Sequence, residues 1–193
     1  MLFYKFNGDC HRTVINPIKF INHRFFWKSM ELSEQVLTVC MERCIDLAHR
    51  ASSVIGRPLV GAMVVDRKGN IVGEGYKQII RGTSFTQHAE RVALDAADGR
   101  TAGSYLFTTL EPCLEKKSEI QIFCSCSRCI VKRGIKTVIV GLLDNSPSMK
   151  PGSGRAYLEA AGIDVILYDA YKNRIKQELM PVLYEIPKSA RQG

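Results

Sequence analysis

The sequence predicts an α/β protein with three layers, α/β/α, in which a mixed sheet of about five strands lies between helices. Short apolar, β-branched runs alternate with amphipathic stretches of about ten residues, a pattern typical of parallel strands joined by crossover helices. The length of 193 residues and the hydrophobic content of 46% suit one ordinary globular domain with a full core.

The first half of the domain predicts a helix, a hairpin and a second helix. From Ser33, apolar residues recur at steps of three and four, which indicates an amphipathic helix of about five turns. The runs LVGAMVV from Leu59 and IVGEGY from Ile71 flank the turn sequence DRKGN, so we expect an antiparallel hairpin. The sequence HAERVALDAA from His88 then predicts a helix that ends near Gly99.

The second half continues the alternation of strands and helices. Three further apolar strands are expected, at 104–109, 137–141 and 163–168. Three helices, each followed by a glycine or a proline, are expected at 126–133, 154–161 and 171–180. Because strands and helices alternate, helices should cover both faces of the sheet.

The chain is expected to divide into an N-terminal extension at 1–30, one domain at 31–186 and a short tail at 187–193. The extension mixes aromatic and basic residues without a clear period. It has charged or polar residues every few positions and no small-residue cleavage site, so it does not resemble a signal peptide. No charge-free stretch approaches the roughly 18 residues that cross a bilayer. We therefore expect a cytoplasmic protein without a membrane span.

The seven cysteines favour metal binding or catalysis over a disulfide framework, because their number is odd and no export signal is evident. Cys40 and Cys44 fall on the apolar stripe of the first helix and are expected in the core. The net charge of +8 favours phosphorylated or polyanionic partners. Half of this charge lies in the first 30 residues, which carry five basic and one acidic side chain.

Three motifs carry residues suited to metal chemistry: QHAERVAL, TTLEPC and CSRCIVKRG. One histidine and two thiolates with a fourth open position form a ligand set that suits catalytic zinc. H-x-E followed by P-C-x-x-C is the signature of zinc deaminases, in which the glutamate transfers protons and does not bind the metal. From Leu59 onward the sequence resembles the cytidine deaminase superfamily, through VGAMVVDRKGNIVGEGY, QHAERVAL and TTLEPC.

The resemblance implies the fold, the cofactor and the roles of four residues. It implies a sandwich of the cytidine deaminase type that binds Zn²⁺. His88, Cys113 and Cys126 would be the metal ligands, and Glu90 would be the catalytic proton carrier. By resemblance we also expect a homo-oligomer.

Three cysteines compete for the third ligand position, because twelve residues separate Cys113 from Cys126 where the simple motif has two. Cys126 stands eight residues before Gly134, as the second thiolate does in relatives whose motif reads C-x-x-x-I-I-x-x-G. Cys124 and Cys129 remain alternatives for this position.

The segment after the cysteines resembles the deaminase domain of bacterial riboflavin biosynthesis, which acts on a pyrimidine that carries ribose phosphate. The resemblance rests on a Gly-x-Gly at a helix start and on the sequence AGIDV before a strand. Residues 152–155, GSGR, are consistent with a phosphate site made of backbone N–H groups and the Arg155 guanidinium, or with a flexible loop that precedes a helix. One feature departs from that family, because Arg57-Pro58-Leu59 stands where it has Pro-Asn-Pro.

The sequence therefore predicts a zinc-dependent hydrolytic deaminase that converts an exocyclic ring amine of a pyrimidine-type nucleotide to a carbonyl and releases ammonia. The small-molecule substrate would be riboflavin-pathway-like or CMP/dCMP-like. One alternative is a nucleic acid deaminase acting on tRNA adenosine or cytidine, but the long insert and the AGIDV segment argue against it. The other is a catalytically silent zinc-binding accessory module, which has no need of Glu90.

Overall fold

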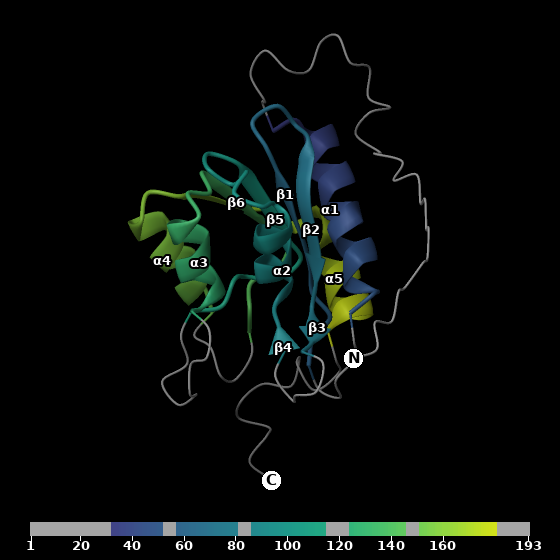
Figure 1. Cartoon of the computed structure of the whole chain (residues 1–193). Helices are drawn as coiled ribbons and strands as arrows, with labels where there is room; N and C mark the ends of the chain where they lie inside the picture. Colours follow the sequence, from purple (N-terminus) through teal and green to yellow (C-terminus); the bar gives the residue numbers. More distant parts are fainter. Residues whose placement is uncertain (1–31, 52–56, 81–85, 115–123, 146–150, 181–193) are drawn as a thin grey trace, which may run out of the picture.

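The computed structural model describes residues 32–51, 57–80, 86–114, 124–145 and 151–180 (Figure 1). The N-terminal extension and the C-terminal tail expected from the sequence lie outside these residues. The larger elements are α1 (Glu34–Ala48), β1 (Gly61–Val65), β2 (Ile71–Tyr76), α2 (Ala89–Ala96), β5 (Tyr105–Thr108), α3 (Cys126–Lys132), β6 (Thr137–Val140), α4 (Ser153–Ala160), β7 (Asp164–Leu167) and α5 (Lys172–Leu179). The expected order of helices and strands is confirmed.

The main sheet has five strands in the order β2-β1-β5-β6-β7. β1 pairs antiparallel with both β2 and β5, whereas β5, β6 and β7 pair in parallel. This arrangement confirms the expected mixed sheet and its antiparallel hairpin. A second, two-stranded ladder of β3 (Gln78–Ile79) and β4 (Thr86–Gln87) was not expected, because strands of two residues are too short to show a period.

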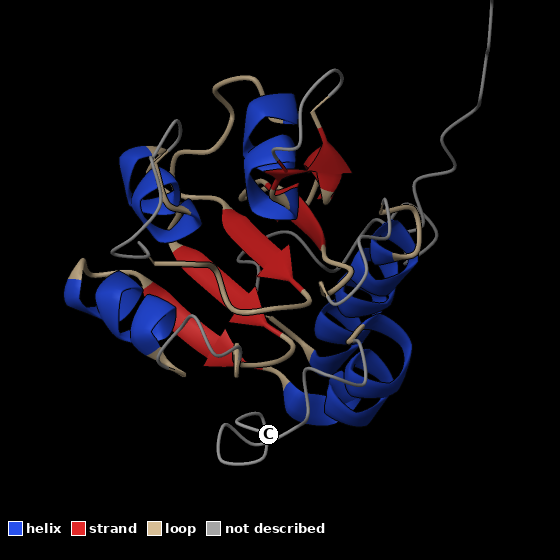
Figure 2. Cartoon of the chain, turned by 90° about the horizontal axis from the view of Figure 1, so that it is seen from below, coloured by secondary structure: helices blue, strands red, loops and turns tan. Residues whose placement is uncertain are grey.

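Helices lie on both faces of the main sheet and give the three expected layers. Helices α1 and α5 cover one face, and α2, α3 and α4 cover the other (Figure 2). The central strands supply the middle of the core, where Phe107 and Ile139 are fully buried. No helix within the described ranges has the length and apolar character needed to cross a membrane.

Helix α1 begins at an N-cap and packs its apolar stripe on the sheet. The Ser33 side chain accepts a hydrogen bond from the Val36 N–H, which satisfies one of the free donors of the first turn. Cys40 and Cys44 are fully buried on this stripe, as expected. Burial raises the pKa of Cys40 to about 12, so this thiol stays protonated and serves as a small apolar side chain.

Two glycines of β2 allow helix α2 to lie directly against the strand backbone. A Cβ atom on Gly73 would lie 2.1 Å from the Ala93 carbonyl oxygen, and a Cβ on Gly75 would lie 2.3 Å from that of Ala89. No side chain fits at these distances, so only glycine permits this approach. Because His88 is the N-cap residue of α2, the contact also fixes where His88 lies.

Replacing Gly75 with alanine is expected to lower both the unfolding free energy and the affinity for zinc. The added methyl overlaps the α2 backbone, and overpacking of this kind costs about 1–3 kcal/mol. Urea denaturation and zinc competition with a chelator measure the two effects. Gly61→Ala is the matched control, because its Cβ would meet the backbone of α1 and not of α2. Equal zinc affinities for the two variants would contradict the role given to Gly75.

Candidate functional site

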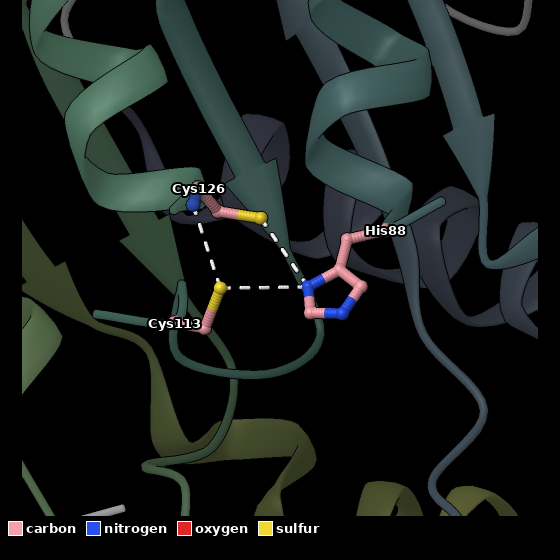
Figure 3. A group of neighbouring side chains, drawn as sticks. All are labelled: His88, Cys113 and Cys126. Atoms are coloured by element: carbon pink, nitrogen blue, oxygen red, sulfur yellow. Dashed lines mark hydrogen bonds between the residues drawn. The ribbon is translucent and has the colours of Figure 1, made fainter. Parts of the chain in front are cut away.

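Three segments that are distant in sequence meet on the side of the sheet that α2 and α3 cover. His88 directly precedes α2, Cys113 follows β5, and Cys126 is the first residue of α3 (Figure 3). One ligand atom from each of these residues lies within 4.8 Å of the other two. The structure thus brings together the three residues that the sequence singled out as ligands.

The spacing and chemistry of this cluster fit a zinc ion. The His88 Nδ1 atom lies 3.5 Å from the Cys113 Sγ atom and 3.4 Å from the Cys126 Sγ atom (Figure 3). Tetrahedral zinc with ordinary Zn–N and Zn–S bonds separates a nitrogen ligand from a sulfur ligand by about 3.6 Å. Imidazole and thiolate are also the ligands that zinc prefers, so His88, Cys113 and Cys126 are positioned to hold it.

The start of α3 holds the two thiols next to each other. Ser125 is the N-cap residue, and its hydroxyl accepts a hydrogen bond from the Arg128 N–H. The Cys126 N–H points at Cys113 and donates to its Sγ atom over 3.4 Å. Hydrogen bonding from Cys126 and then from His88 lowers the pKa of Cys113, which makes this thiol the first of the pair to ionise.

Glu90 lies in the first turn of α2, two residues after His88, and its side chain is buried. Burial raises the pKa of this carboxyl to about 7, against the opposing effect of the His88 charge. Cys113 and a hydrogen bond with Cys126 also affect the same pKa, so the carboxyl group lies beside the ligand cluster. Glu90 is not one of the three clustered ligand residues, so its carboxyl group is available for proton exchange beside the metal cluster.

The two alternative ligands, Cys124 and Cys129, form a disulfide with each other. Their sulfur atoms are therefore bonded to each other, and Cys126 is the free thiol among the three neighbouring cysteines Cys124, Cys126 and Cys129. The sequence expectation disfavoured a disulfide framework and did not consider a single local bridge of this kind. A bridge across five residues leaves no trace in the number of cysteines.

Ser127 was not identified from the sequence, yet it ties the Cys113 segment to α3. Its hydroxyl donates to the Pro112 carbonyl oxygen over 3.1 Å, and its N–H donates to the Cys113 carbonyl oxygen over 3.1 Å. Ser127 is fully buried. A serine two residues into a predicted helix is common, so its type alone gave no signal.

Arg155 lies in the first turn of α4, where the sequence predicted a phosphate site. The N–H groups of Gly152 and Arg155 each donate to the Glu111 carboxylate over 3.0 Å. This corrects the backbone part of the prediction, because an internal carboxylate engages two of the expected phosphate donors. The guanidinium forms a half-exposed pair with Glu159 on the same helix, and such pairs are weak. Substrate binding by Arg155 stays a prediction.

Lys77 is a buried cation that the sequence did not single out. It follows β2, and its ammonium group donates to the Pro58 carbonyl oxygen. Burial, with a smaller effect of the Arg57 charge, lowers the pKa of Lys77 to about 8. Lys77 also acts on the pKa of His88, which places positive charge near the metal ligands. A lysine at a strand end is ordinarily exposed, so its residue type gave no hint of this position.

The chain is similar to enzymes of riboflavin biosynthesis. It is 40% identical to the riboflavin biosynthesis protein RibD of Aquifex aeolicus over 108 residues, which are 56% of this chain and 28% of that protein. It is 31% identical to the RibD of Chlamydia pneumoniae over 159 residues, which are 80% of this chain and 38% of that protein. The chain therefore spans well under half the length of these curated relatives.

Solved structures share the fold. The diaminohydroxyphosphoribosylaminopyrimidine deaminase/5-amino-6-(5-phosphoribosylamino)uracil reductase of Thermotoga maritima matches with a TM-score of 0.63 and 32% identity, over 75% of this chain and 39% of that one. The dCMP deaminase of cyanophage S-TIM5 matches with a TM-score of 0.56 and 23% identity, over 70% of this chain and 99% of that one. At that lower identity the likeness shows the fold alone.

Residues 34–142, which are more than half of the chain, match the family described as the cytidine and deoxycytidylate deaminase zinc-binding region. The matched span begins with α1 and includes Glu90 and all three residues of the metal cluster. By this match, this chain belongs to the family of cytidine and deoxycytidylate deaminase zinc-binding domains.

Proposed function

We propose that the chain is a zinc-dependent hydrolytic deaminase that acts on an exocyclic amine of a pyrimidine-type nucleotide. The observation that carries the proposal is the buried Glu90 carboxyl group beside the cluster of His88, Cys113 and Cys126. Three protein ligands leave one tetrahedral position for a reactant, which distinguishes catalytic from structural zinc sites. A structural site alone would not require an ionisable group at that position.

Each residue of the site has a distinct task in this reaction. His88, Cys113 and Cys126 would hold the zinc ion, which lowers the pKa of a coordinated water toward neutrality. Glu90 would take a proton from the attacking water and deliver it to the ring nitrogen and then to the departing amine. A carbon–oxygen bond forms, the carbon–nitrogen bond breaks, and ammonia leaves.

A pyrimidine that carries ribose phosphate is the substrate class we favour. The curated relatives above are riboflavin biosynthesis proteins, and the name of the Thermotoga protein includes a diaminohydroxyphosphoribosylaminopyrimidine deaminase. Lys77 adds a buried positive charge near the metal ligands, and Arg155 lies in the first turn of α4. Both charges would favour an anionic substrate. The name of the Thermotoga protein also includes a reductase, and this chain covers only 39% of that protein. The proposal is therefore limited to deamination.

The two alternative functions find less support. The curated relatives described above are named for riboflavin biosynthesis, and that name does not point to a nucleic acid substrate. The buried Glu90 argues against a silent accessory module, since metal binding alone has no use for it. A homo-oligomeric state and a cytoplasmic location stay predictions from the sequence.

Cys126→Ser is expected to lose most of the bound zinc, whereas Cys129→Ser is expected to keep it. Cys126 lies in the ligand cluster, but the Cys129 sulfur is bonded to Cys124. A site reduced to two strong ligands binds zinc far more weakly. Elemental analysis of each purified variant measures the zinc content. Full zinc in Cys126→Ser together with loss in Cys129→Ser would assign the third ligand to Cys129 instead.

Glu90→Gln is expected to keep zinc while its rate of ammonia release falls by roughly 10²- to 10⁴-fold. Glutamine preserves the size of the side chain but cannot accept the proton from water. Asp95→Asn on the same helix is the control, because Asp95 pairs with Arg133 at the surface. An undiminished rate in a zinc-replete Glu90→Gln protein would refute the proposed mechanism.

Ammonia release across free bases, nucleosides, nucleotides and the phosphoribosylaminopyrimidine tests the substrate class. A nucleotide should be preferred over its nucleoside by at least about tenfold in kcat/KM, because charge-assisted hydrogen bonds to phosphate are strong. Arg155→Ala should remove this preference and leave nucleoside turnover unchanged. Arg174→Ala is the matched control, since Arg174 forms the same kind of pair with Glu178 on α5. Activity confined to folded RNA would favour the nucleic acid alternative.

A further inference from the structure

Glu111 is a second buried carboxylate of the site region, and the mechanism above does not use it. It lies two residues before Cys113 and is only 2% exposed. Its Oε2 atom accepts hydrogen bonds from the N–H groups of Asp144 and Gly152, and its Oε1 atom accepts one from Arg155. Its own N–H donates to the Leu142 carbonyl oxygen over 2.8 Å.

Glu111 takes the place of an N-cap side chain for helix α4. The N-cap residue of α4 is Gly152, which has no side chain to accept a hydrogen bond from the first turn. Arg155 is the third residue of the helix, and its N–H is a group that an N-cap side chain ordinarily satisfies. The Glu111 carboxylate supplies the missing acceptor and places negative charge at the positive end of the helix dipole.

Helix α4 also packs directly against the segment that carries Cys113. A Cβ atom on Gly154 would lie 2.1 Å from the Pro112 carbonyl oxygen and 3.2 Å from the Glu111 Oε1 atom. Backbone therefore meets backbone, with no side chain between. A change in the Glu111 hydrogen bonds moves both the helix and the peptide that leads directly to Cys113.

The other end of this segment is fastened to α3. Ser127 bonds the carbonyl oxygens of Pro112 and Cys113, and the Cys126 N–H bonds the Cys113 sulfur. Glu111 thus holds one side of the segment and the start of α3 holds the other. Cys113 lies between these two anchors, within 3.5 Å of His88.

We propose that Glu111 is a positioning residue that keeps the Cys113 sulfur within binding distance of the metal by anchoring its backbone to α4. It acts through Cys113 and contacts neither metal nor substrate. The inference rests on the metal cluster of the proposed function and does not depend on which substrate is turned over.

Glu111→Gln tests this role, because it keeps the side-chain volume but replaces one acceptor oxygen with a donor. That donor would face a backbone N–H group, so at least one of the three hydrogen bonds is lost. Loss of a residue that orients a ligand typically weakens metal affinity by 10- to 100-fold, and we expect a decrease in this range for Zn²⁺. The thiolate-to-metal absorption bands of the Co²⁺-substituted protein should shift as well, since they report the geometry at sulfur.

Leu158→Ala separates positioning from general destabilisation of α4. Leu158 is fully buried on the same helix, so its truncation lowers the stability of α4 without removing a bond to Glu111. We expect it to lower the unfolding midpoint and to leave Zn²⁺ affinity and the Co²⁺ spectrum unchanged. Equal weakening of Zn²⁺ binding in Leu158→Ala, or wild-type Zn²⁺ binding in Glu111→Gln, would overturn the proposal.

Glu111→Asp provides the conservative comparison and decides the matter if the glutamine variant does not fold. Aspartate keeps the charge but is one methylene shorter, so Zn²⁺ affinity should lie between those of the wild type and of the glutamine variant. Wild-type affinity in Glu111→Asp, when the glutamine variant is unfolded, would count against positioning. A wild-type protein that binds Zn²⁺ but releases no ammonia would contradict the proposed function and leave this test intact.

Discussion

The close backbone contact between β2 and α2 is the constraint on which the site depends. The three residues positioned to hold a metal come from separate segments, so no local sequence can build the cluster alone. Gly73 and Gly75 set how near α2 lies to the sheet, and His88 and Glu90 occupy the beginning of that helix. Because protein interiors are closely packed, a single methyl group added at either glycine would displace α2 and therefore change the position of His88 in the metal cluster.

The sequence predicted the main sheet and its helices because each carries a clear hydrophobic period or a clear stop. Helix α3, for example, ends immediately before Arg133-Gly134, and Gly134 adopts a positive φ of 68°. Glycine adopts such a conformation without steric cost, so it marks the end of a helix in the sequence. The β3–β4 ladder has only two residues in each strand and depends on contacts that no period reveals.

The site was predictable only where residue type and spacing restrict the chemistry. His88, Glu90 and Cys113 follow from their motifs, but three cysteines within six residues left the third ligand open. The pairing of Cys124 with Cys129 depends on three-dimensional contact, and it leaves Cys126 as the free thiol that lies with His88 and Cys113. The phosphate prediction overlooked Glu111 for the same reason, because its partners lie more than thirty residues further along the chain.

Glu90 and Glu111 show how surroundings give two buried carboxyl groups different tasks. Both Glu111 oxygens accept hydrogen bonds from backbone N–H groups of two segments. These bonds tie α4 to the Cys113 segment. Glu90 is buried beside the metal ligands, and its burial raises its pKa to about 7. Burial beside the metal cluster thus suits Glu90 to proton transfer, whereas three backbone donors from α4 and its neighbouring segment suit Glu111 to holding the Cys113 segment in place.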